Sequence, residues 1–167
     1  MQKNTQYSSI QFTTLPAMNI ARYAVVSSSP EQDAFAHMDD WAQQNGLFQT
    51  PGYTPRRIGW EFPFVSQEQT DHFGLRGYVA AYLLPDGFTM RNGGAEIVSI
   101  GADTYAVLTL AGVRANARDA VRHGYKLLRD YVNAGEYRTQ SWVNRLVFEE
   151  ELVQDGTSSM TLFLPIK

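Results

Sequence analysis

The chain has 167 residues, of which 44% are hydrophobic and 19% charged, a composition that suits one folded domain and argues against intrinsic disorder. Its formal net charge of -3 argues against a nucleic-acid-binding surface, which needs a surplus of basic residues on one face. The absence of cysteine excludes disulfides and thiolate chemistry. Because no signal peptide or membrane-spanning run is visible, we expect a cytoplasmic protein that binds neither a membrane nor nucleic acid directly.

The first half of the chain predicts strands near residues 9–13 and 17–27, a helix near 30–45, and strands near 56–63 and 75–84. Arg22–Val26 is short, aromatic and β-branched, as strands are. Ser29-Pro30 followed by Gln32 is a typical helix start, and Gly46 is a typical stop.

The second half predicts the same succession of elements. We expect a strand region near 95–111, a helix near 116–134, and strands near 142–153 and 158–166 that are joined by a hairpin turn at Asp155-Gly156. Gly135 ends this second helix as Gly46 ends the first.

The two halves match in order and in detail, which indicates a duplicated β-α-β-β unit. Arg57-Ile58-Gly59-Trp60-Glu61 resembles Arg145-Leu146-Val147-Phe148-Glu149. The predicted fold is therefore α+β: a single domain over residues 1–167 with pseudo-repeat halves at about 9–86 and 95–167. Its one antiparallel sheet carries two helices on one face, and a ligand groove lies between the halves.

Three short motifs follow one another along the second half of the chain, and their order and spacing are informative. They are Tyr105-Ala106-Val107-Leu108 with Ala111-Gly112 after it, Phe148-Glu149 with Leu152, and the terminal Phe163-Leu164-Pro165-Ile166. Together they resemble the GyrI-like (gyrase-inhibitor-like) effector-binding family over roughly residues 9 to 167. The same domain forms the C-terminal drug-sensing part of AraC-class and MerR-class multidrug regulators. The chain departs from the family at Ala111-Gly112-Val113, where Gly-Pro is frequent, and at Phe163, where tyrosine is frequent.

The resemblance implies that Glu149 lies in the ligand pocket and meets a positively charged ligand. Strand alternation places Glu149 and Glu151 on one face, which we assign to the groove, and Phe148 on the other, which we assign to the helices. The repeat places Glu61 in the equivalent position, with Trp60 on the helix-covered face. The alternative is that these carboxylates merely face water.

Aromatic residues supply the remaining candidates for the ligand site. Rings that flank a carboxylate form a cation-π box for an aromatic or quaternary cation. The candidate rings, each of which could instead pack in the core, are Tyr78, Tyr82, Tyr105, Trp142 and Phe163.

The predicted function is the binding of small amphipathic or aromatic compounds, in particular cations, in an aromatic and acidic cleft by a sensor or sequestering protein. One alternative is hydrolysis of strained electrophiles, with Glu149 as general base and Tyr105 assisting. Another is a protein-binding inhibitor with an unknown partner. We expect no cofactor and no metal, since His37, His72 and His123 are too dispersed for a metal motif.

Overall fold

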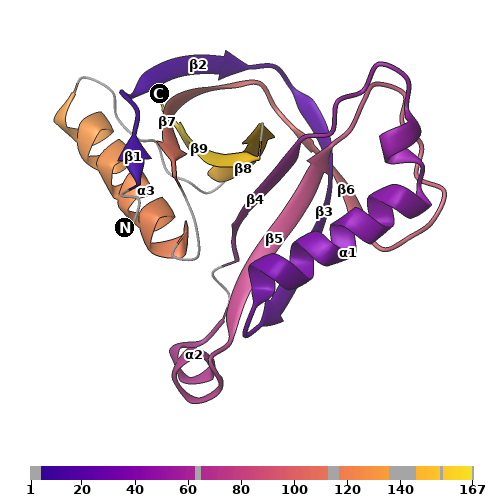
Figure 1. Cartoon of the computed structure of the whole chain (residues 1–167), viewed down its shortest axis with the longest axis horizontal. Coiled ribbons are helices and arrows are strands. Elements are labelled where there is room, and N and C mark those ends of the chain that lie inside the picture. Colours follow the sequence, from indigo (N-terminus) through magenta and orange to yellow (C-terminus); the bar gives the residue numbers. More distant parts are fainter. Residues whose placement is uncertain (1–4, 63–64, 113–116, 136–145, 155, 167) are drawn as a thin grey trace. The chain divides into compact units, whose positions relative to one another are not determined.

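The computed structural model describes residues 5–62, 65–112, 117–135, 146–154 and 156–166. The chain forms two compact units. Residues 18–100 form the α1 unit, and residues 1–17 with 101–167 form the α3 unit. The elements, labelled in Figure 1, are β1 (Gln6–Tyr7), β2 (Gln11–Leu15), β3 (Met18–Ser27), α1 (Pro30–Gln44), η1 (Leu47–Gln49), β4 (Arg57–Glu61), α2 (Gln67–Phe73), β5 (Arg76–Leu83), β6 (Glu96–Ile100), β7 (Asp103–Ala111), α3 (Ala117–Ala134), β8 (Phe148–Gln154) and β9 (Thr157–Pro165).

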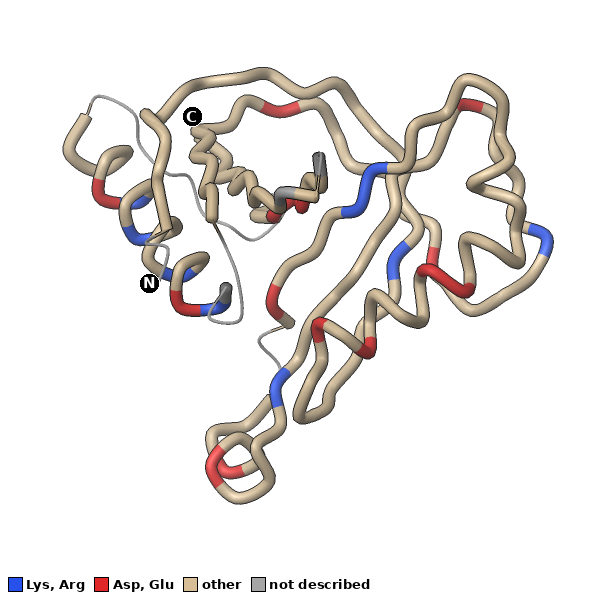
Figure 2. The backbone as a smooth tube through the Cα atoms, viewed as in Figure 1, with Lys and Arg blue, Asp and Glu red and all other residues tan. Residues whose placement is uncertain are grey.

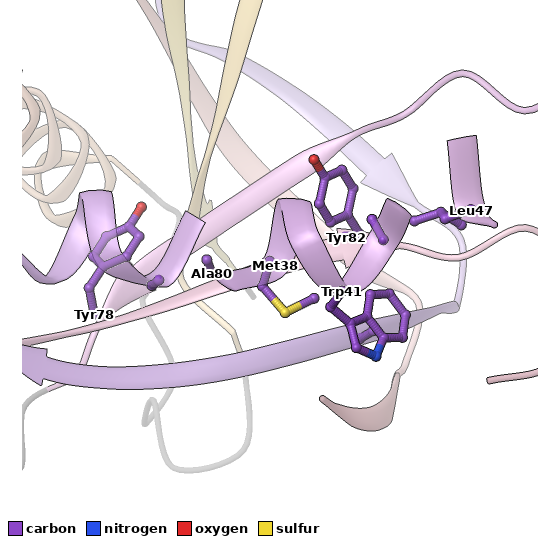
Figure 3. Close-up of a cluster of buried hydrophobic side chains, with 9 residues drawn as sticks. Met38, Trp41, Leu47, Tyr78, Ala80 and Tyr82 are labelled. Carbon is purple, nitrogen blue, oxygen red and sulfur yellow. The ribbon is translucent and has the colours of Figure 1, made fainter. Parts of the chain in front are cut away.

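The α1 unit is an antiparallel sheet in the order β4-β5-β3-β6, with α1 packed on one face. The residues of β5 that point toward the helix alternate with those that point away, as the pleat of a strand requires. Figure 3 shows the resulting core, which consists of Ala21, Ala34, Met38, Trp41, Ala42, Leu47, Tyr78, Ala80 and Tyr82.

The α3 unit is built in the same way from β8-β9-β7-β2, with β1 also paired to β7 and with α3 on one face. Its core consists of Ala106, Leu108, Leu110, Leu128, Val132, Leu162, Leu164 and Ile166. Gly124 allows α3 to approach the sheet closely, because a Cβ at this position would lie 2.6 Å from Cδ1 of Leu162.

The two units share one topology, which confirms the α+β fold with a duplicated β-α-β-β unit. In one unit β3-α1-β4-β5 is completed by β6, which pairs with β3. In the other, β7-α3-β8-β9 is completed by β2, which pairs with β7. The strand expected near 9–13 therefore belongs to the second repeat rather than to the first half in which it lies along the chain.

Local signals located α1 correctly but did not identify its cap. The helix begins at Pro30 after Ser29, as expected, yet the Ser29 side chain makes no capping hydrogen bond. A complete capping box lies instead at Ser66 and Gln69, where it begins α2, a helix that the sequence pattern did not predict. The region 95–111 contains two strands, β6 and β7. The parts of the expected elements at 63, 116, 142–145 and 155 lie outside the described residues.

The close packing of β5 against the chain after β4 generates a stability prediction. A Cβ at Gly77 would lie 2.6 Å from the backbone oxygen of Phe62, which cannot move aside as a side chain could. We expect Gly77→Ala to lower the free energy of unfolding by about 1–3 kcal/mol, the usual cost of overpacking. Chemical denaturation measures the change. Gly93→Ala is the matched control, since a Cβ there meets nothing within 4 Å, and equal losses for the two variants would contradict the prediction.

Candidate functional site

The register between β8 and β9 determines which face of the α3 unit each carboxylate occupies. Glu149 pairs with Leu162, and Leu162 belongs to the core beneath α3. Directly opposed residues of antiparallel strands lie on the same face, so Glu149 is on the helix-covered side. Glu151 pairs with Met160 and lies on this side too. The expectation that Glu149 and Glu151 occupy the uncovered face, with Phe148 toward the helix, is therefore wrong.

Glu149 is held by the helix that covers it. Its side chain is 7% exposed, and the hydroxyl of Tyr125, on α3, donates a hydrogen bond of 2.7 Å to its Oε2. Glu151 is less buried and accepts a hydrogen bond of 3.1 Å from the hydroxyl of Ser158. The bond from Tyr125 shows directly that the Glu149 side of β8 faces α3.

The opposite face of this sheet carries an aromatic cluster. The ring of Phe148 stacks on that of Phe163, with centroids 4.5 Å apart and planes inclined by 14°. The Tyr105 ring meets both of them edge-on, at 5.6 Å from Phe148 and 5.9 Å from Phe163. All three side chains are buried, although α3 covers the other side of the sheet. We call this surface, together with Glu150, the aromatic face.

Glu150 is the carboxylate on the aromatic face. It follows Phe148 by two residues and pairs with Thr161, which in turn pairs with Thr109. The two threonine hydroxyl oxygens lie 3.2 Å apart, so Glu150 heads a polar row beside the rings. Its side chain is only 5% exposed. A carboxylate removed from water in this way favours any positive charge that reaches it.

Glu61, Tyr78 and Tyr82 lie together in the α1 unit, but on the helix-covered face of its sheet. Tyr78 and Tyr82 share a face as expected, and Figure 3 shows both in the core with Met38 and Trp41. Glu61 pairs with Tyr78 and so lies on this same side, whereas Trp60 lies on the opposite side. The expectation that Glu61 lines an uncovered face, with Trp60 toward the helix, is wrong for the same reason as in β8.

A polar network anchors Tyr82 at the edge of this core. Its hydroxyl donates a hydrogen bond of 2.5 Å to Oδ1 of Asp39, and Arg57 forms an ion pair of 3.1 Å with the same carboxylate. The guanidinium of Arg57 also lies 4.6 Å from the centroid of the Phe35 ring. These groups satisfy one another, which indicates a structural role in the α1 unit.

The structure brings two of the proposed site residues, Tyr105 and Phe163, onto one face. It adds Phe148, which the sequence pattern assigned to the helix side, and Glu150. Trp142 lies outside the described residues. The sequence alone does not reveal which residues of β9 lie opposite those of β8. Because Glu149 lies opposite Leu162 of the core, Glu150 must face the other side of the sheet. Within the described ranges, no group of three or more His, Asp or Glu residues is placed to hold a metal ion.

No protein-family model matches the sequence, and no curated protein matches it. Several solved structures do match. The C-terminal domain of EcmrR has a TM-score of 0.65 and 12% identity, with 95% of this chain and 97% of that domain covered. A hydrolase from Listeria innocua has a TM-score of 0.61 and 13% identity, with 95% and 91% covered. SAV2435 bound to tetraphenylphosphonium has a TM-score of 0.51 and 13% identity, with 96% and 94% covered. These likenesses show that the chain shares the fold of the EcmrR C-terminal domain and of the other two proteins.

The hydrogen bond from Tyr125 to Glu149 predicts a loss of stability when it is removed. Tyr125→Phe leaves a buried carboxylate with one donor fewer, so we expect the free energy of unfolding to fall by about 1–3 kcal/mol. Urea denaturation of this variant beside Tyr131→Phe, whose ring is half exposed, measures the effect. An equal, small change in both variants would show that the bond contributes nothing.

The buried phenol of Tyr82 predicts a dependence of stability on alkaline pH. Burial, and then the hydrogen bond to Asp39, raise its pKa above the ordinary value of 10.0. The unfolded chain therefore loses this proton at lower pH than the folded chain does. The stabilisation is complete below about pH 10 and is lost as pH rises toward the folded-state pKa. Denaturation at a series of alkaline pH values should show a steeper decline for the unaltered chain than for Tyr82→Phe, and parallel declines would refute the assignment.

Proposed function

We propose that this protein binds small amphipathic or aromatic cations on the aromatic face of the α3 unit, with Glu150 as the partner of the positive charge. The observation that carries the proposal is a carboxylate that is 5% exposed and lies on the same face as three mutually packed rings. The cluster combines apolar surface, ring faces and negative charge, which are the three features that such a ligand requires.

Each component of the face has a physical role in the proposal. The rings of Tyr105, Phe148 and Phe163 supply apolar area, which provides most of the binding free energy for a hydrophobic ligand. Their π faces attract a cation, while the carboxylate of Glu150 discriminates a cation from a neutral molecule of the same shape. Trp142, which lies outside the described residues, stays a further predicted ring contact.

The comparisons support the class of ligand. SAV2435, which has a similar fold, was solved bound to tetraphenylphosphonium, a cation whose charge is surrounded by four phenyl groups. The C-terminal domain of EcmrR has a similar fold, and the EcmrR chain was also solved in complex with DNA. We infer a sensor or sequestering role for the present chain, in which ligand occupancy is the signal.

The distribution of charge and the composition of the helices bear on whether the protein binds nucleic acid or a membrane. Basic and acidic residues are interspersed along α3, and the described strands of the α3 unit carry acidic residues but no lysine or arginine (Figure 2). We therefore expect no direct, specific binding of nucleic acid. Of the helices in the described ranges, none combines the length and the apolar character that crossing a membrane demands. We propose that the protein acts in the cytoplasm on a small-molecule ligand.

A hydrolytic activity is the second candidate, because one structure with a similar fold is named a hydrolase. The pair that the sequence suggests for this chemistry, Glu149 and Tyr105, lies on opposite faces of the sheet. Glu150, which shares the face of Tyr105, is the carboxylate that could activate a water molecule there. Mass spectrometry of ligands incubated with the protein separates turnover from binding.

The decisive experiment compares two neighbouring carboxylates and two ligands of different charge. We expect Glu150→Gln to weaken binding of tetraphenylphosphonium by about tenfold to a hundredfold, the loss of one charge-assisted contact. Binding of neutral triphenylphosphine oxide should be nearly unchanged. Isothermal titration calorimetry measures both affinities.

Glu149→Gln is the matched control, since it removes a buried carboxylate from the adjacent residue on the other face. It should leave both affinities within about twofold of the unaltered chain, as expected for a group that the ligand does not touch. If Glu149→Gln lost cation binding and Glu150→Gln did not, the ligand site would lie on the face beneath α3 instead. Absence of tetraphenylphosphonium binding by the unaltered chain would overturn the proposal.

A further inference from the structure

Strand β3 is paired with neighbouring strands to different extents on its two sides. On its inner side it pairs with β5 from Ile20 to Ser27. On its outer side it pairs with β6 from Met18 to Arg22 only. In the part of the chain that the structure describes, no strand pairs with the outer side of residues 23–27. We call this stretch the open edge.

The open edge has the composition of a strand that accepts a partner. Its sequence is Tyr23-Ala24-Val25-Val26-Ser27, which is apolar and β-branched. The side chains of Tyr23 and Val26 are 38% and 46% exposed. Sheet edges are usually protected by lysine, proline or a bulge. The open edge has neither residue, and its register with β5 runs without interruption.

We propose that the open edge pairs with the open edge of a second copy of this chain, as an antiparallel two-stranded contact about a two-fold axis at Val25. This places Val25 opposite the partner's Val25, Tyr23 opposite the partner's Ser27, and Ala24 opposite the partner's Val26. The arrangement joins two α1 units into one continuous sheet, and twofold symmetry is the commonest form of self-association.

The length of the open edge matches that of the segment which a second copy would contribute. On one side the edge is bounded by Glu96, the first residue of β6, which lies opposite Arg22. On the other side it ends with β3 itself at Ser27, before α1 begins at Pro30. In the symmetric pairing the partner's strand therefore ends beside Tyr23, where β6 begins, so each copy supplies a segment of the length that the other leaves open.

Polar groups at the two ends of the open edge are complementary in the same arrangement. The hydroxyl of Ser27 donates a hydrogen bond of 2.6 Å to Asp33, which fixes an exposed carboxylate beside that end of the strand. At the other end the imidazole of His37 stacks on Tyr23, with ring centroids 3.6 Å apart. Pairing brings the Asp33 carboxylate of each copy beside the Tyr23 of the other. Nε2 of His37 is already hydrogen-bonded to the carbonyl oxygen of Gly94, so the Tyr23 hydroxyl is the donor that meets this carboxylate. These residues lie in the α1 unit, so this inference stands or fails separately from ligand binding in the α3 unit.

The mass of the protein in solution tests the inference. We expect light scattering coupled to size-exclusion chromatography to give twice the 18.8 kDa of one chain. Val26→Lys places a charge on the edge, as natural edge strands do, and should shift the mass to that of one chain. Val153→Lys, at an exposed valine of β8, is the matched control and should remain a dimer. A single-chain mass for the unaltered protein at its highest soluble concentration overturns the inference.

Because the chain has no cysteine, single cysteine variants test the register as well. Val25→Cys places the two sulfur atoms opposite each other at the two-fold axis, within reach of a disulfide, and should give a covalent dimer under mild oxidation. Ala24→Cys shifts each sulfur away from its counterpart and should cross-link much less. Equal cross-linking of the two variants, or a dimer that survives Val26→Lys, would assign self-association to another surface and overturn the inference. Association with a different protein's strand while the chain alone remains monomeric would overturn it too.

Discussion

The cross-strand register between β8 and β9 governs the chemistry of the α3 unit. Three successive carboxylates, Glu149, Glu150 and Glu151, follow Phe148 along one strand, and alternation sends them to opposite faces. Because Phe148 is opposite Phe163, Glu150 must share the face of the rings, while Glu149 must lie beneath α3. A slip of one residue would exchange these environments and bury a phenylalanine where Tyr125 now meets a carboxylate.

Much of the fold could be predicted from short-range signals, since these depend only on neighbouring residues. Ser29-Pro30 located the start of α1, the strand compositions located β3 and β5, and the repetition of elements predicted the duplicated topology. Short-range signals could not predict that β2 completes the sheet of the α3 unit and that β6 completes the sheet of the α1 unit. Both precede or follow a β-α-β-β unit in the chain, and only their long-range pairing with β7 and β3 shows which unit each one completes.

The candidate site was harder to predict than the fold because a strand with apolar residues on both sides has no obvious interior face. Two sets of apolar residues alternate at β8, Phe148 with Leu152 and Val153 with Val147, which immediately precedes the strand. Either set could have packed against the helix. The sequence pattern favours the larger residues on the helix side, but the core beneath α3 is built mainly from aliphatic side chains, and the rings lie on the other face. The same reasoning misplaced Glu61 in β4. Because the two units are equivalent, a wrong choice of the helix-covered face in one strand leads to the same wrong choice in the equivalent strand of the other unit.

Helix α2 stands apart from both cores. None of its residues is buried, and Phe73 at its end is 69% exposed. Its ends are instead satisfied locally, by the capping box at Ser66 and by Gly74 in the left-handed conformation. Because the ends of α2 are capped locally and none of its residues is buried, the helix makes little contribution to the core of the unit. The link between β4 and β5 is therefore the position at which sequence can diverge, or foreign sequence can be inserted, with little consequence for the sheet that it joins.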